Sequence, residues 1–147
     1  MRVPFLIGRL MFGGYFLFAG INHFKKTHEL SQYAGSKNVP QPDLAVKATG
    51  AALIAGGTSI LLGIKPKIGA LAIAGFLAGV SPIMHNFWSQ EDPQQRMHDE
   101  VNFAKNLALA GGAVALMGVE EPWPASVPVG QPSKGNRIAR LFREIAA

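Results

Sequence analysis

The residues best suited to chemistry gather between Ser81 and Gly112, a polar stretch set between apolar ones. It holds two of the four histidines, four of the nine acidic residues and three asparagines. On a helix, residues spaced three or four apart share one face. That spacing places together the side chains of His98, Asn102, Lys105 and Asn106. Polar groups are costly against lipid, so this face is predicted to point into a bundle or a hydrated cavity.

Further polar residues stand at the ends of other apolar stretches, as Asn22-His23 and His85-Asn86. A quinone headgroup needs donors for its two carbonyls and a proton exchange on reduction, and histidine suits both tasks near neutral pH. We therefore predict a quinone site and assign no catalytic residue. The predicted cofactor-binding residues are Asn22, His23, His85, Asn86, His98, Asn102, Lys105 and Asn106. A purely structural role for each residue taken singly stays open, because polar residues also collect where helices meet water and headgroups.

A metal site would have to use His23, His85 and His98, but no HxxxH or HExxH spacing supports one. Haem would need two histidines facing each other within the membrane, and only His23 and His85 are candidates. The chain has no cysteine, which excludes disulfides and thiolate-bound metals. Neither a metal nor haem is predicted.

Four apolar stretches must position these residues, and each has about 20 residues, the length of a helix that crosses a bilayer. They are Val3–Phe24, Leu44–Ile64, Ile68–Trp88 and Val101–Val119. Of all residues 48% are hydrophobic and only 16% are charged, which is typical of a membrane protein. The fold class predicted is all-α: an integral membrane four-helix bundle over residues 1–119. Residues 120–147 are predicted to be a Pro-rich tail that ends in a short basic amphipathic helix.

An even number of spans places both termini on one side of the membrane. That side would hold eight of the 14 Lys and Arg residues and the other side six, which favours cytoplasmic termini in the inner (cytoplasmic) membrane. The polar ends of all four stretches would then meet on the opposite side. The net charge of +5 is scattered without a basic stripe, so no nucleic-acid partner is predicted.

Arg9 lies about two turns into the first stretch, where a charge needs a partner. Glu120 and Glu121 follow the fourth stretch on the same side, and an ion pair of Arg9 with either one is predicted to hold the bundle together. Small residues repeat at spacing four as Ala52/Gly56, Ala70/Ala74/Ala78 and Gly75/Gly79. Such stripes indicate close helix packing in lipid.

Three motifs resemble those of the DoxX family of small integral membrane proteins. They are IGRLMFGGYFLFAGINHF near the start, SPIMHNFW before the charged loop, and NFAKNLALAGGAVAL in the last stretch. The resemblance covers roughly Met1 to Val119 and leaves out the tail. It implies a bundle of four helices and an association with quinone-linked redox chemistry, since some relatives are subunits of a thiosulfate:quinone oxidoreductase. It supplies no agreed catalytic residues.

The sequence-based hypothesis is a subunit or accessory of a quinone-linked redox complex. The alternative is a non-catalytic scaffold or assembly subunit, and whether the protein is itself an enzyme stays open. A transporter is disfavoured, because the second and third stretches are almost wholly apolar at mid-depth. The partners expected are the lipid bilayer and other membrane or redox subunits, and a homo-oligomer stays open.

Overall fold

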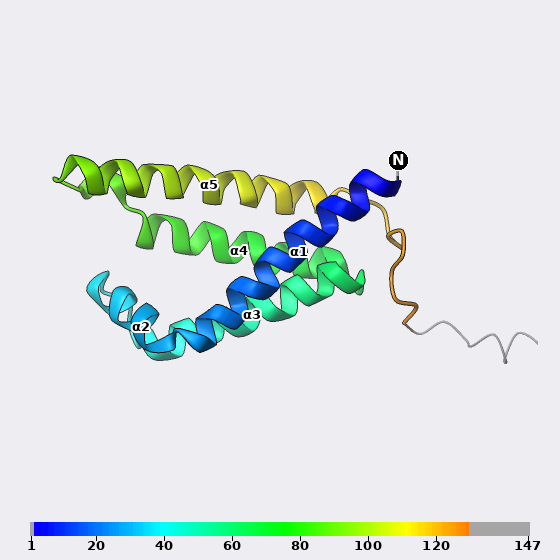
Figure 1. The fold of residues 1–147 in the computed structure, drawn as a ribbon, viewed down its shortest axis with the longest axis horizontal. Coiled ribbons are helices and arrows are strands. Elements are labelled where there is room, and N and C mark those ends of the chain that lie inside the picture. The colour runs from blue at the N-terminus through cyan, green and yellow to red at the C-terminus, as the bar shows by residue number, and fades with distance from the viewer. Residues whose placement is uncertain (1, 130–147) are drawn as a thin grey trace, which may run out of the picture.

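The computed structural model describes residues 2–129, and over this range the chain is all-α (Figure 1). In chain order the helices are α1 (Arg2–Lys25), α2 (Thr27–Ser36), α3 (Pro42–Leu62), α4 (Pro66–Met84), a short 3₁₀ helix η1 (Phe87–Ser89) and α5 (Pro93–Met117). The amphipathic helix predicted near the C-terminus lies outside the described residues.

Helix boundaries follow ordinary local rules. Proline opens α3, α4 and α5, where the missing N–H of the first helical residue would have no partner in the helix anyway. Asp92 caps α5 by accepting a hydrogen bond from the backbone N–H of Gln95 at 2.8 Å. Gly63 ends α3 in the left-handed conformation, with φ of 67°. The turn between α3 and α4 is therefore tight.

Three helices are long and apolar enough to cross a membrane, over Val3–Lys25, Pro42–Leu62 and Pro66–Ser89. These spans confirm the first three of the predicted apolar stretches. The fourth predicted stretch overlaps α5 from Val101 to Met117, and α5 has 25 residues but begins with the polar sequence PQQRMHDE. In the described residues α5 is not among the helices that are long and apolar enough to cross a membrane. The fourth span therefore stays a prediction.

Helices α1 and α3 pack backbone against backbone (Figure 1). A Cβ atom on Gly57 would lie 2.6 Å from the backbone nitrogen of Leu17, and one on Gly20 would lie 2.7 Å from the carbonyl oxygen of Gly50. Real Cβ atoms do not approach so closely, so only glycine fits at these positions. The contact was not among the small-residue stripes identified in the sequence.

Helix α4 meets α3 in the same way near the turn that joins them, where a Cβ on Gly69 would lie 2.8 Å from the carbonyl oxygen of Gly56. Further along α4, Gly75 and Gly79 have no atom within 4 Å of an added Cβ. The predicted Gly75/Gly79 stripe is therefore not a helix contact. Instead α3 and α4 diverge away from their turn, as Figure 1 shows.

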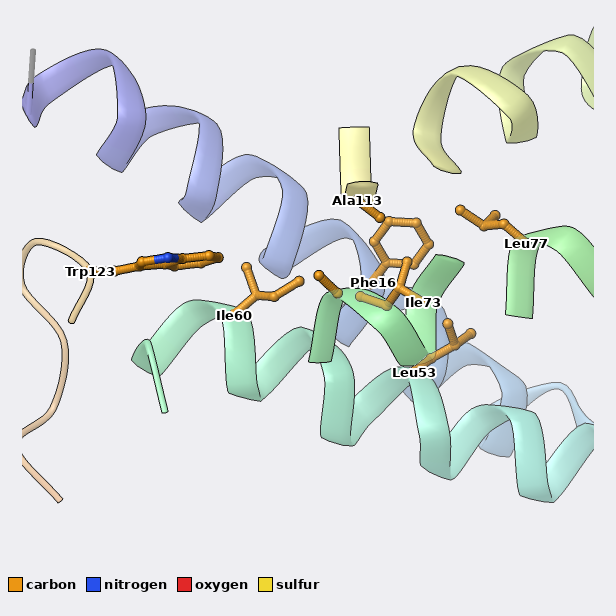
Figure 2. Close-up of a cluster of buried hydrophobic side chains, with 8 residues drawn as sticks. Phe16, Leu53, Ile60, Ile73, Leu77, Ala113 and Trp123 are labelled. Atoms are coloured by element: carbon orange, nitrogen blue, oxygen red, sulfur yellow. The ribbon is translucent and has the colours of Figure 1, made fainter. Parts of the chain in front are cut away.

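The hydrophobic core runs along the contact of α1, α3, α4 and α5, with Phe16, Ile60, Ile73 and Ala113 buried in it (Figure 2). Trp123 belongs to the same core although it follows α5, and its side chain is only 2% exposed. Its ring meets Phe5 edge to face at 5.2 Å between ring centroids. The first part of the Pro-rich segment therefore packs onto the helices.

Different segments of the chain lie at the two ends of the molecule. The N-terminus and the segment after α5 lie at one end, while α2 and the connection from α4 to α5 lie at the other (Figure 1). As predicted, the polar ends of the helices lie at this second end. There Lys37, directly after α2, donates a hydrogen bond to the side-chain oxygen of Asn86 at 2.9 Å.

Candidate functional site

A cavity of about 570 Å³ lies where α3 and α4 diverge. Its walls include residues from α1, α2, α3, α4 and α5, and most of them are apolar. Phe16, Leu53 and Leu77 belong to both the cavity wall and the hydrophobic core. Gly75 and Gly79 also line the cavity, so the missing side chains on α4 contribute directly to its volume.

Helix α2 covers one end of the cavity with Leu30, Tyr33 and Ala34. The hydroxyl of Tyr33 donates a hydrogen bond to the carbonyl oxygen of Met84 at 3.1 Å, at the end of α4. Burial raises the pKa of Tyr33, and the negative charge of Asp99 raises it further. The phenol is therefore protonated at neutral pH and keeps its donor role toward Met84.

Six side chains with polar groups belong to an otherwise apolar lining: Tyr15, His23, Tyr33, Thr49, His85 and Asn106. His23 Nδ1 lies 2.8 Å from the carbonyl oxygen of Ala19, one turn earlier in α1. Thr49 likewise donates to the carbonyl oxygen of Ala45 at 2.8 Å. A few placed polar groups in an apolar cavity of this size are typical of sites for small organic molecules.

Asp99 lies behind His85 and is fully buried. Its Oδ1 accepts a hydrogen bond from Gln95 at 3.1 Å and lies 3.4 Å from His85 Nδ1 and 3.6 Å from His98 Nδ1. Its Oδ2 lies 3.8 Å from Lys37 Nζ. Burial alone would raise the pKa of Asp99, but the hydrogen bonds from Gln95 and His85, the charge of Lys37 and the contact with His98 together lower it. Asp99 is thus a carboxylate at neutral pH.

The Asp99 cluster connects three helices, because Lys37 follows α2, His85 follows α4 and Asp99 lies in α5. Lys37 binds both Asn86 and Asp99 and so ties α2 to the far ends of α4 and α5. His85 belongs to the cluster and to the cavity wall alike. The charged cluster and the cavity wall are therefore connected directly through His85.

The structure brings only part of the predicted site together. His23, His85 and Asn106 line the cavity. Asn86 instead binds Lys37 and Ser89, and Asn102 binds His98. The remaining predicted residues do not line the cavity either: Asn22, His98 and Lys105. Within residues 2–129, no group of three or more histidine or acidic side chains is arranged to hold a metal ion.

The inward face of α5 differs from the predicted one. The predicted face began at His98, whose side chain is 66% exposed, and Lys105 is exposed as well. The inward face is turned by one residue and begins at Asp99, continuing through Phe103, Asn106 and Ala113. The apolar residues at this spacing were the signal that could have identified Asp99, because a carboxylate in line with them must be buried. Nothing in the sequence places Lys37, whose position depends on how α2 packs.

Arg9 lies at the opposite end of the molecule and is 4% exposed. It donates hydrogen bonds to the carbonyl oxygens of Pro124 at 2.7 Å, Leu61 at 3.0 Å and Ala125 at 3.1 Å. The ion pair predicted with Glu120 or Glu121 is not formed: the described residues contain no carboxylate within 4.0 Å of Arg9. The physical reason is that the chain after α5 folds back, so backbone carbonyls reach the guanidinium in place of the two acids.

A model of the DoxX family matches residues 5–86, more than half of the chain. No curated protein and no solved structure matches the chain. The matched region contains α1 to α4 and the cavity residues His23 and His85, but not α5 with Asp99 and Asn106. The chain belongs to the DoxX family of membrane proteins.

Proposed function

Taking membership of this family as the premise, we propose that the protein binds a quinone-type headgroup in the cavity and acts as a subunit or accessory of a quinone-linked redox complex. The single observation that supports this most is the cavity of about 570 Å³, with apolar walls and a few polar groups that include His23 and His85. Pockets for small organic ligands have volumes of roughly 300 to 1,000 Å³.

The distribution of polar groups suits a molecule with a polar ring and an apolar tail. His23 and His85 stand at the ends of α1 and α4, on the side of α2. Phe16 and Leu53, from the middle of α1 and α3, form an apolar wall that suits an isoprenoid tail. A headgroup near the histidines would thus leave the tail among groups with no hydrogen-bonding demand.

Binding is tested with purified protein in mild detergent and a short-tailed quinone, supplied oxidised and reduced, by equilibrium dialysis. Gly79→Leu places a side chain into the cavity, because nothing lies within 4 Å of an added Cβ at Gly79. We expect Gly79→Leu to weaken binding at least about tenfold, since the ligand and the leucine would compete for the same volume. The matched control is Gly111→Leu in α5, where an added Cβ also meets nothing but which is outside the cavity.

Membership of a complex is tested separately, by isolation from native membranes in gentle detergent and mass spectrometry of the co-eluting proteins. Redox subunits in the same peak would support the proposal. Absence of quinone binding in both redox states would contradict it and leave the scaffold function as the alternative.

A further inference from the structure

The hydrogen-bonding state of the cavity wall indicates which redox form of the ligand fits. A carbonyl oxygen only accepts hydrogen bonds, so the contact of His23 Nδ1 with the Ala19 carbonyl at 2.8 Å requires the proton to be on Nδ1. A neutral imidazole carries one N–H, and its second nitrogen is then an acceptor. His23 Nε2 is therefore an acceptor, and no group among the described residues hydrogen bonds to it.

The position of the ring proton follows in the same way for the second histidine, His85. His85 Nδ1 lies 3.4 Å from Asp99 Oδ1, and an ionised carboxylate only accepts. The proton of a neutral His85 is consequently on Nδ1, and Nε2 is again an acceptor.

Two of the hydroxyl groups in the wall have also used their protons. Tyr33 donates to the carbonyl oxygen of Met84, and Thr49 donates to that of Ala45. Their oxygens can still accept. Two further polar side chains of the described wall, Tyr15 and Asn106, make no hydrogen bond within the described part of the chain, so both can still donate.

From this inventory we infer that the cavity selects the reduced ligand, a quinol with two hydroxyl donors, over the oxidised quinone, with His23 Nε2 as the acceptor of a quinol hydroxyl. The inference rests on the proposed function and adds the redox form and the recognising atom. A quinone has acceptors only, so it could accept from Tyr15 and Asn106. It would still leave Nε2 of His23 and of His85 without a donor, and a buried polar group without a partner is costly. A quinol donates to the histidines and can still accept from Tyr15 and Asn106.

The test compares three ligands of one shape on the purified wild-type protein at about pH 8, where imidazole is ordinarily neutral. They are a short-tailed quinol kept reduced under anaerobic conditions, the matching quinone, and the dimethyl ether of the quinol. We expect the quinol to bind about tenfold more tightly than the quinone, the ratio for one acceptor left unpaired. The dimethyl ether keeps the ring but has no donor, so it should bind as weakly as the quinone.

The variant His23→Phe keeps a ring at the cavity wall and removes the acceptor. It should lower quinol affinity to the level of the quinone while quinone affinity changes less than about twofold. His28→Phe is the control, because His28 is exposed on α2 and does not line the cavity. Wild-type measurements decide the matter even if His23→Phe does not fold.

Two results overturn the inference in distinguishable ways. Equal or tighter binding of the quinone by the wild type would contradict the quinol preference and leave the proposed function intact. Binding of neither redox form would contradict both.

Discussion

Two charged side chains are buried at opposite ends of this molecule, and they are held in different ways. Arg9 is surrounded by the backbone carbonyls of Leu61, Pro124 and Ala125. Asp99 is surrounded by side chains that themselves carry or exchange protons: Lys37, His85 and His98. Backbone carbonyls cannot titrate, so the contacts of Arg9 do not depend on pH. The contacts of Asp99 do, and they reach the cavity through His85.

The comparison indicates that Arg9 fastens the fold and that Asp99 supports the candidate site. Arg9 joins the start of α1 to the end of α3 and to the segment that carries Trp123. Asp99 joins α2, which covers the cavity, to α4 and α5. Two substitutions and a pH series test this division of roles.

The largest effect is expected for Arg9→Met. It removes three charge-assisted hydrogen bonds and leaves buried carbonyls unpaired, so the free energy of unfolding should fall by about 3–5 kcal/mol. Arg96→Met in the exposed part of α5 is the control and should change it little. Unfolding is measured in detergent by titration with SDS. Glu120→Gln and Glu121→Gln should leave the free energy of unfolding unchanged. A loss of stability in either variant would support the ion pair of Arg9 with that glutamate.

An intermediate effect is expected for Asp99→Asn, which keeps the shape of the side chain and removes its charge. Lys37 and His85 would lose their charged partner, so the free energy of unfolding should fall by about 1–3 kcal/mol. Unlike Arg9→Met, this change should also weaken ligand binding in the cavity. Glu100→Gln, at the exposed neighbouring position, is the control for both measurements. If Asp99→Asn left ligand binding unchanged, the Asp99 cluster would have no part in binding at the cavity.

The smallest effect concerns pH. The pKa of Asp99 is lower in the folded than in the unfolded chain, so its stabilising contribution is complete above about pH 4 and is lost as the pH falls through the folded pKa. The difference in stability between wild type and Asp99→Asn should therefore shrink as the pH falls below about 4. The deficit of Arg9→Met should stay constant over this range. Parallel curves for both variants would contradict the contrast between the two ends.

The fold was largely predictable from sequence, since apolar stretches of membrane-spanning length define α1, α3 and α4 directly. The convergence of polar helix ends also followed from topology alone. Helix α5 was harder, because its polar start allows two nearly equivalent inward faces, one from His98 and one from Asp99. Burial decides for Asp99, and burial depends on the packing of the neighbouring helices.

The site was predictable only where a residue stands at the end of a recognisable helix, as His23 and His85 do. Lys37 and Tyr33 lie in or beside α2, whose placement over the cavity depends on contacts between distant segments. The partners of Arg9 were missed for a related reason. Backbone carbonyls leave no mark in a sequence, whereas Glu120 and Glu121 are conspicuous.

The divergence of α3 and α4 also has a mechanical meaning. Gly69 contacts Gly56 beside the turn, whereas Gly79 borders the cavity ten residues further along α4. Ten residues of helix span about 15 Å, so a tilt of α4 by about 4° around the glycine contact displaces the cavity wall by about 1 Å. A small tilt of α4 about the contact of Gly69 with Gly56 would thus change the width of the cavity. Lys37, through its contacts to Asn86 and Asp99, links α2 to the ends of α4 and α5 that lie away from this glycine contact.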